Sequence, residues 1–128
     1  MFITLEGVDG SGKTTQAAML ADALGASAMT LREPGGTDAA ERIRQLLADP
    51  ETPLDPIAEL MLFCAARADL VSRVIRPALE IGRTVICDRF TDSTIAYQGV
   101  ARGLGIVRVR ELSDVATDGL VPDLTLWL

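Results

Sequence analysis

A run of eight residues near the N-terminus has the composition and spacing of a phosphate-binding loop. Residues 7–14 read GVDGSGKT and match the pattern G-x-x-x-x-G-K-[ST], between a short apolar run and a helical pattern. In such a loop, glycines let backbone N–H groups approach phosphate oxygens, and the helix that follows adds the positive end of its dipole. Lys13 is expected to contact the β- and γ-phosphates of a nucleoside triphosphate, and the Thr14 hydroxyl to bind Mg²⁺. The residues predicted to surround the phosphates are Gly7, Val8, Asp9, Gly10, Ser11, Gly12, Lys13, Thr14 and Thr15.

Lys13 is the only lysine among the twelve lysine and arginine residues of the chain. A chain that has almost no lysine but keeps one at this position favours a phosphate site over the alternative, a glycine-rich turn without a ligand. The sequence contains no histidine, which excludes Ser-His-Asp and Cys-His catalysis and zinc sites with histidine ligands.

An acidic residue, Asp88, follows the apolar run of residues 84–87. If this run is a strand of a parallel sheet, Asp88 lies at its carboxyl end, where ligands bind in open α/β sheets. A carboxylate at this place has the form of a Walker B aspartate and could hold Mg²⁺ directly or through water. Acidic residues after strands are common, so this prediction depends on the phosphate loop.

Arg32 and Arg89 each follow a predicted strand, so both are expected at the sheet edge that carries the phosphate loop. A guanidinium group matches the geometry of phosphate oxygens, and two such groups would hold the phosphate of a small acceptor. This pattern indicates a kinase. A GTPase would need the guanine-specifying sequence N-K-x-D, for which no lysine remains. The alternative for each arginine is a surface salt bridge.

Phe63 and Arg67 are four residues apart in a predicted helix and therefore share a face. This face is turned away from the apolar stripe that contains Leu60, Cys64 and Val71. An aromatic ring and a guanidinium group on one wall can stack on a base and hydrogen-bond to its edge. The alternative is that Phe63 is a core residue.

Short β-rich runs alternate with longer helical patterns, which predicts an α/β fold with a parallel sheet flanked by helices. The predicted strands are residues 2–5, 28–31, 84–87 and 124–128. The predicted helices are residues 14–24, 38–48, 56–81, 91–97 and 107–117, with a kink or break near Pro77 and a glycine-rich loop at residues 99–105. Residues 1–128 form one domain in this interpretation. A parallel sheet normally continues through another crossover helix, so we expect the domain to be incomplete at its C-terminal end.

Composition narrows the class of protein. The chain has 128 residues, 48% of them hydrophobic, and its net charge of −6 argues against a general nucleic-acid binder. No apolar run is long enough to span a membrane, and Glu6 and Asp9 interrupt the segment where a secretory signal would be apolar. Cys64 and Cys87 are expected to be reduced core residues. These features favour a cytoplasmic protein without a nucleic-acid or membrane partner.

The chain resembles the bacterial thymidylate kinases in five segments, which are EGVDGSGKTT, REPGGT, LMLFCAAR, DRFTDST-AYQG and PDLTL. The resemblance covers essentially the whole chain and corresponds to the N-terminal two-thirds of the family's sequence. It implies a P-loop fold of the nucleoside monophosphate kinase type. It also implies transfer of the γ-phosphate of ATP to thymidine monophosphate (dTMP), with Mg²⁺, to give ADP and thymidine diphosphate (dTDP) for dTTP biosynthesis. A homodimer is implied as well.

The resemblance gives the base and the sugar of dTMP a set of contacts. It implies that Phe63 stacks on thymine and that Arg67 donates to a base carbonyl. Thr94 and Gln98 would read the remaining polar edge of the base. Tyr97 would pack under the sugar where a ribose 2′-hydroxyl would clash, and would thereby select deoxyribose.

At the phosphate end, the resemblance implies that Arg32 and Arg89 hold the acceptor phosphate, with Ser93 close by. Asp9 takes the family's acidic position in the phosphate loop, where it orients the acceptor or its metal. The resemblance also places Glu33 in the dTMP site and implies a cis peptide bond between Glu33 and Pro34. The residues implied in catalysis are Asp9, Lys13 and Arg89, and those implied in metal binding are Asp9, Thr14 and Asp88.

The chain departs from part of the family inside the phosphate loop. Some relatives carry a catalytic arginine there, whereas this chain has Gly10 and Ser11. In the other group that arginine comes from a mobile lid later in the sequence, which is the type that the chain resembles. In the family that lid follows the segment present here, so the 128-residue polypeptide alone is expected to be weakly active or inactive and poorly stable. Two alternatives remain, namely a kinase for another nucleoside or nucleotide and a nucleotide-binding module without catalysis.

Overall fold

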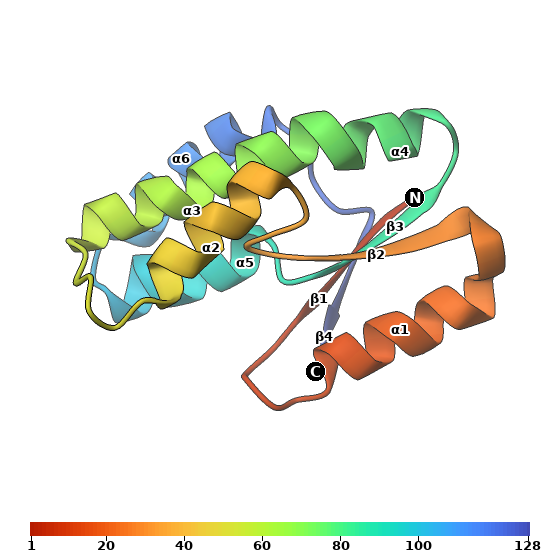
Figure 1. Cartoon of the computed structure of the whole chain (residues 1–128), viewed down its shortest axis with the longest axis horizontal. Helices are drawn as coiled ribbons and strands as arrows, with labels where there is room; N and C mark the ends of the chain where they lie inside the picture. The colour runs from red at the N-terminus through yellow and green to blue at the C-terminus, as the bar shows by residue number, and fades with distance from the viewer.

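Four short parallel strands form the centre of the fold in a computed structural model that describes residues 1–128. They are β1 (Phe2–Glu6), β2 (Ala28–Arg32), β3 (Thr84–Asp88) and β4 (Leu124–Trp127), and they lie in the order β2-β3-β1-β4 (Figure 1). Successive strands along the chain are joined through helices, as parallel pairing requires. The predicted α/β class with a parallel sheet is therefore confirmed.

The register of the strands brings three loops to one edge of the sheet. Asp88 at the end of β3 pairs with Leu5 of β1 and with Arg32 of β2. The backbone N–H of Glu33 donates to the carbonyl of Asp88 at 3.0 Å, and that of Arg89 donates to the carbonyl of Leu5 at 2.9 Å. The ladder therefore extends one residue into the loops after β2 and β3, and this fixes where both loops start.

Helices cover both faces of the sheet. Helix α1 (Lys13–Leu24) lies on one face, and the other helices lie on the opposite face (Figure 1). Those helices are α2 (Asp38–Ala48), α3 (Pro56–Leu70), α4 (Arg76–Glu80), α5 (Thr91–Thr94) and α6 (Ile106–Thr117). None of them has the length and apolar character that a bilayer crossing requires.

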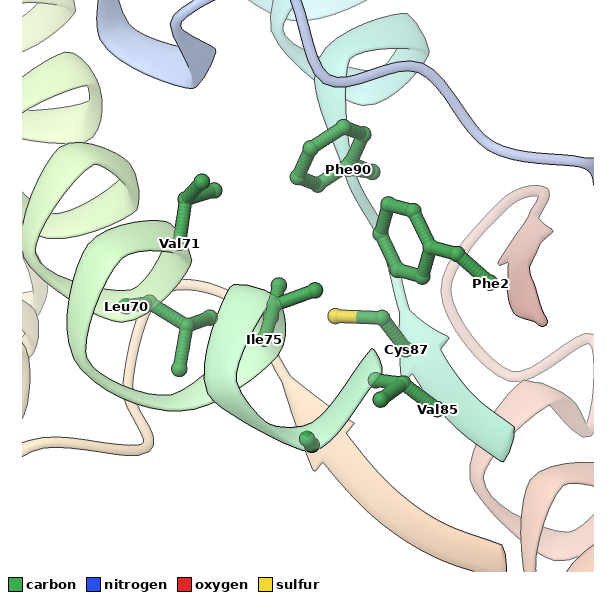
Figure 2. Packing of buried hydrophobic residues seen from close by; sticks show 8 residues of the cluster. Phe2, Leu70, Val71, Ile75, Val85, Cys87 and Phe90 are labelled. Atoms are coloured by element: carbon green, nitrogen blue, oxygen red, sulfur yellow. The ribbon is translucent and has the colours of Figure 1, made fainter. Parts of the chain in front are cut away.

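Alternating side chains of the strands build a separate apolar core on each face. Ile3, Leu5 and Ile86 pack with Ala17 of α1. On the opposite face, Phe2, Val85 and Cys87 pack with the helical segment of residues 70–78 and with Phe90, whose ring meets that of Phe2 edge-to-face at 5.0 Å (Figure 2). The two-residue period of a strand accounts for this division. Cys64 and Cys87 are buried and free, as predicted.

The long predicted helix of residues 56–81 is helical almost throughout but contains a wider turn. Residues Val71–Ile75 form a π-helical turn between α3 and α4. Pro77 lies just after it and has no N–H to donate to the preceding turn, and its ring would clash with a carbonyl in a regular helix. The disturbance expected near Pro77 therefore takes the form of an expanded turn.

The predicted loop of residues 99–105 is partly wrong. A π-helical segment, Ile95–Ala101, continues α5, so the first three residues of that stretch are helical. Gly99 packs against α6 in this segment, and Cβ of Val109 lies 3.6 Å from the position that a Cβ of residue 99 would take, which is an ordinary van der Waals contact. The peptide bond between Glu33 and Pro34 is cis, as the resemblance implied.

Candidate active site

A cavity of about 920 Å³ opens at the carboxyl edge of the sheet. It receives residues from the loops after β1, β2 and β3 and from α3 and the segment of residues 91–102. The cavity is lined by most of the residues that were predicted from the sequence to form the site. These are Asp9, Gly10, Gly12, Lys13, Thr14, Thr15, Arg32, Glu33, Phe63, Arg67, Asp88, Arg89, Ser93, Thr94, Tyr97 and Gln98, whereas Gly7, Val8 and Ser11 do not line it.

The phosphate loop joins β1 to α1 through left-handed glycines. Gly10 and Gly12 have φ angles of 80° and 95°, which other residues adopt only with strain. Lys13 is the first residue of α1, and only 6% of its surface is exposed. Its Nζ donates to the carbonyl of Val8 at 2.6 Å and to Ser11 Oγ at 3.4 Å. The ammonium group is therefore held by the loop itself and lines the cavity, rather than extending into bulk solvent.

Thr14 and Asp88 meet across the cavity floor. The Thr14 hydroxyl donates to Asp88 Oδ2 at 2.5 Å, although the two residues are 74 positions apart. Hydroxyl and carboxylate oxygens are ligands that suit Mg²⁺. The chain contains no cluster of three or more acidic, histidine or cysteine side chains suited to a metal ion. This sparse set fits a cation that one or two protein oxygens hold together with phosphates and water.

Arg89 is fixed by contacts on three sides. Its Nη2 bonds to Asp9, its Nη1 donates to Ser93 Oγ at 2.9 Å, and its guanidinium group lies 5.3 Å from the centre of the Tyr97 ring. Arg89 has a φ of 70°, an uncommon value for a residue with a side chain, and this turn directs it into the cavity. Asp9 thus pairs with Arg89 and makes no hydrogen bond to Thr14 or Asp88, so its predicted metal role gains no support from its contacts.

Arg32 is held less firmly than Arg89. It lines the cavity and forms a salt bridge to Glu41 at 3.2 Å, with both side chains about half exposed. Exposed pairs of this kind contribute little, so the guanidinium group is free to exchange Glu41 for a ligand. The surface salt bridge that was the alternative for Arg32 and Arg89 exists in both cases, and both side chains still face the cavity.

Arg67 lies in the protein interior rather than on a face apart from the core. Only 2% of its surface is exposed. Its Nε and Nη2 donate to Glu33 Oε2 at 2.8 and 2.6 Å, and Nη2 also donates to the Phe90 carbonyl and to Thr94 Oγ1. Burial alone would lower the pKa of Arg67, but the Glu33 carboxylate outweighs it and raises this pKa, so the guanidinium group stays charged.

Two buried atoms of this pair have no hydrogen-bond partner within the chain. They are Nη1 of Arg67 and Oε1 of Glu33. Unsatisfied buried polar atoms are rare in folded proteins and call for an explanation such as a ligand. Because both residues line the cavity, Arg67 can offer one N–H to a bound molecule while its other nitrogens stay occupied.

The remaining wall of the cavity is formed by Phe63, Tyr97 and Gln98. Phe63 is half-buried and belongs to none of the three apolar clusters of the core, which disfavours the alternative that it is a core residue. Gln98 is buried, and its Nε2 donates to Glu59 Oε1 at 2.7 Å. Glu59 in turn accepts hydrogen bonds from Arg102.

Several residues in or near the cavity were not predicted from the sequence to belong to the site. Glu59, Arg102 and Arg44 line it, and Arg44 donates to the Pro34 carbonyl at 3.0 Å. Glu6 lies behind it, buried at the end of β1, and accepts hydrogen bonds from the backbone N–H of Phe90 and from Ser93 Oγ. Glu6 could have been found from the sequence, because an acidic residue at the end of a fully buried strand is unusual. Nothing in the sequence around Arg44 and Glu59, which lie on helices, indicates that they line the cavity.

The chain is similar in sequence and in fold to known proteins of one family. The chain matches the thymidylate kinase family over residues 5–128. It is 56% identical to the thymidylate kinase of Synechococcus sp. (strain JA-3-3Ab) and 50% identical to that of Deinococcus radiodurans, in each case over 100% of this chain and 64% of the relative. Its fold matches a crystal structure of thymidylate kinase from Ehrlichia chaffeensis with a TM-score of 0.93 and 44% identity, over 99% of this chain and 70% of that one.

The chain spans about 64% of the length of the curated relatives named above. The structural match confirms the P-loop fold of the nucleoside monophosphate kinase type that the resemblance implied. A family match over nearly every residue, with this level of identity, leaves no room for a chance similarity in the phosphate loop alone. The chain belongs to the thymidylate kinase family.

Proposed function

We propose that this chain binds ATP and dTMP in its single large cavity and transfers the γ-phosphate to give ADP and dTDP. The observation that carries the proposal is that one cavity of about 920 Å³ is lined by the phosphate loop, by two arginines and by a wall with one aromatic ring and several polar side chains. The family match and the names of the relatives support the same activity. A nucleotide-binding module without catalysis would not need two arginines opposite the loop.

The donor end is formed by the phosphate loop. The backbone N–H groups before α1 and the ammonium group of Lys13 would bind the β- and γ-phosphates, where Lys13 would exchange its contact with the Val8 carbonyl for phosphate oxygens. Thr14 and Asp88 would hold Mg²⁺. The bound metal ion would supply positive charge against the phosphate oxygens.

The acceptor end would hold dTMP by its phosphate and by its base. Arg89, held by Asp9 and Ser93, and the more exposed Arg32 would bind the phosphate. Phe63 would stack on the thymine ring, and the free Nη1 of Arg67 would donate to a carbonyl of the base. Two arginines that neutralise the acceptor phosphate would let its oxygen approach the γ-phosphate.

Two further contacts of dTMP stay predictions. Thr94 is buried beside Arg67 and accepts one hydrogen bond from it, so its hydroxyl keeps its hydrogen and one lone pair for the base edge. Tyr97 is partly exposed on the cavity wall and packs on the guanidinium group of Arg89, where a ring could lie under the sugar.

Catalysis in this arrangement consists of positioning and of charge stabilisation. An oxygen of the dTMP phosphate attacks the γ-phosphorus in line, and the ADP oxygen leaves on the opposite side, so that one P–O bond forms as another breaks. Lys13 and Arg89 would stabilise the negative charge on the transferred group from two sides. Asp9 would hold Arg89 in place for this task.

The proposal is tested with a panel of acceptors. Transfer of label from [γ-³²P]ATP would be measured with dTMP, UMP, dCMP and dGMP, and dTMP is expected to be the preferred acceptor. Preference for any other acceptor would contradict the proposed reaction, as would tight binding of ATP and dTMP without transfer in a chain extended to the length of the relatives. The Lys13→Ala variant serves as the control for transfer by a contaminating kinase.

We also propose that the protein is a cytoplasmic homodimer. Ile57 and Met61, four residues apart on α3, are 38% and 48% exposed, and they offer apolar surface that a second copy of the chain would cover. The free thiols of the buried cysteines suit a reducing compartment. Light scattering after gel filtration should give twice the chain mass, and Met61→Glu should give a monomer, whereas a monomeric wild-type protein would exclude the dimer.

A further inference from the structure

The two ends of the Gln98 side-chain amide differ in their contacts. Only 5% of the surface of Gln98 is exposed, and its Nε2 donates to Glu59 Oε1 at 2.7 Å. No hydrogen bond within the chain involves its Oε1. Glu59 and Gln98 both line the cavity, so the free oxygen belongs to a side chain that a bound molecule can reach. The amide therefore presents an acceptor rather than a donor.

The orientation of the amide follows from the chemistry of Glu59. An ionised carboxylate can only accept hydrogen bonds, so an amide beside it must turn its nitrogen toward it. Partial burial alone would raise the pKa of Glu59, but hydrogen bonds from Arg102 and Gln98 outweigh it and lower this pKa, so the side chain is ionised at neutral pH. A reversed amide would place two acceptors against each other, which costs free energy.

Arg102 holds the carboxylate in place from the solvent side. Its Nη2 donates to Glu59 Oε2 at 2.8 Å and its Nε donates to Oε1 at 3.3 Å, in the forked geometry of a two-point contact. The Arg102 side chain is 55% exposed, whereas that of Glu59 is only 14% exposed. Arg102 and Gln98 come from the same wide helical segment and its last turn, so Glu59 of α3 is clamped between two side chains of one element.

We infer that Glu59 is a specificity-determining residue that orients the Gln98 amide so that the site selects a pyrimidine with an N3–H group. The inference rests on the proposed function, because it concerns the base of the acceptor. The Arg67 Nη1 donor and the Gln98 Oε1 acceptor together match a carbonyl next to an imide N–H, which thymine and uracil present. Cytosine presents an amino group and an unprotonated N3 instead, so each contact would become a repulsion between like groups.

Glu59 acts through Gln98 and need not touch the nucleotide. The predicted effect is therefore on discrimination between bases, not on affinity in general. A site that hydrogen-bonds a particular polar group rejects an analogue that cannot satisfy it, because the buried polar groups of the site are then left unpaired. Removing Glu59 lets the amide rotate, and the rejection of cytosine weakens.

The test measures the dissociation constants of dTMP, dUMP and dCMP by titration calorimetry. In Glu59→Ala, the preference for dTMP over dCMP should fall by about tenfold, which is the scale of one lost hydrogen-bond distinction. The preference between dTMP and dUMP should not change, because both bases present the same imide. An equal loss of affinity for all three nucleotides would show that Glu59 has only a structural role, and would overturn the inference.

A charge-swapped variant should reverse the orientation of the Gln98 amide. Glu59→Lys with Arg102→Glu keeps an ion pair but places a donor beside Gln98, so the amide should reverse and dCMP should gain relative to dTMP beyond the Glu59→Ala result. This variant also carries the test if Glu59→Ala does not fold. Discrimination that stays at the wild-type level in the swapped variant would contradict the inference.

Two matched controls separate the orientation of the amide from the loss of charge. Arg102→Ala removes the same ion pair but leaves the acceptor, so its effect on the dTMP-to-dCMP preference should be smaller than that of Glu59→Ala. Glu111→Ala removes an exposed carboxylate from α6 and should change nothing. If the wild-type protein itself fails to prefer dTMP over dCMP, the proposed function fails; if it does prefer dTMP and Glu59→Ala keeps the same preference, only the inference about Glu59 fails.

Discussion

The two ends of the cavity are built in different ways. At the phosphate end, the contacts of Lys13 are local, since Val8 and Ser11 lie five and two positions away. At the base end, Arg67 bonds to Glu33, Phe90 and Thr94, which lie 34, 23 and 27 positions away. Lys13 is held by the loop that joins β1 to α1, although Thr14 and Asp9 of that loop also contact Asp88 and Arg89, whereas Arg67 is part of the core. Substitution of Lys13 should therefore affect chemistry alone, and substitution of Arg67 should affect both binding and stability.

The largest effect is expected for Lys13→Ala. Transfer of the γ-phosphate should fall by at least about a thousandfold, because the donor phosphates lose their only ammonium contact. The free energy of unfolding should change by less than about 1 kcal/mol, since the loop keeps its backbone geometry. Radiolabel transfer and urea denaturation measure the two quantities. A variant that unfolds, or one that keeps its rate, would break the contrast between the two ends.

Arg67→Ala should show the opposite pattern. Glu33 would be left buried without its partner, so we expect a loss of about 3–5 kcal/mol in the free energy of unfolding, measured by urea denaturation. The affinity for dTMP should also fall, by about 1.5–3 kcal/mol, which is the scale of a charge-assisted hydrogen bond.

A double variant separates these two effects of Arg67. Replacing both partners, as in Arg67→Met with Glu33→Met, removes the unpaired charge and should restore most of the stability but none of the dTMP affinity. If the single variant were as stable as the wild-type protein, the buried pair would not be part of the core.

Phe63→Ala sharpens the comparison within the base end. Its half-buried ring lies on the cavity wall, so dTMP affinity should fall by about 1–3 kcal/mol, the scale of a base stacked on an aromatic ring. Phe2→Ala is the matched control, because Phe2 is 1% exposed, packs on Phe90 in the core and does not line the cavity. That substitution should cost mainly stability. Equal effects of the two substitutions on dTMP binding would contradict the assignment of Phe63.

The smallest effect concerns Glu6, which links the two ends. Burial is the main cause that raises the pKa of Glu6 above its ordinary value of 4.5, although hydrogen bonds from Ser93 and Phe90 oppose it. The folded protein therefore binds this proton more readily than the unfolded chain does. Stability contributed by Glu6 is fully present below the unfolded pKa and decreases as the pH rises through the folded pKa.

Glu6→Gln cannot release this proton, so its stability relative to the wild-type protein should improve as the pH rises through that window. The slope of the difference is at most about 1.4 kcal/mol per pH unit. Denaturation of both proteins from acidic to neutral pH measures it. A difference that is constant with pH, or that changes in the other direction, would show that Glu6 has no raised pKa in the folded state.

Local pattern accounts for the parts of the fold that the sequence predicts. The strands are apolar runs, and the phosphate loop is a set of consecutive residues whose types suffice to place it between a strand and a helix. The disturbance near Pro77 was predicted but its form as a wide turn was not, and the helical start of the predicted loop at residues 99–105 was missed, because both depend on contacts with neighbouring helices. A helical period read from the sequence assumes regular spacing, and a wide turn violates it.

The site shows the same division at the level of single side chains. The positions of Arg32, Asp88 and Arg89 followed from the rule that parallel strands end at one edge, and the register of the sheet bears this out. The surroundings of Arg67 did not follow, since the face that the sequence left free is filled by Glu33 and Phe90. No local pattern indicates that a guanidinium group on a helix is buried by a loop more than thirty positions away.

The sequence by itself determined the phosphate loop, the parallel sheet and the family, because each depends on residue types at fixed spacing along the chain. Only the tertiary structure decided which nitrogen of Arg67 stays free, which end of the Gln98 amide faces away from Glu59, and that Glu6 supports the Ser93 hydroxyl. The physical reason is that a buried charge or amide must satisfy its hydrogen bonds with whatever groups the fold brings beside it. Those partners come from other strands and helices, so their identity is a property of the packed molecule.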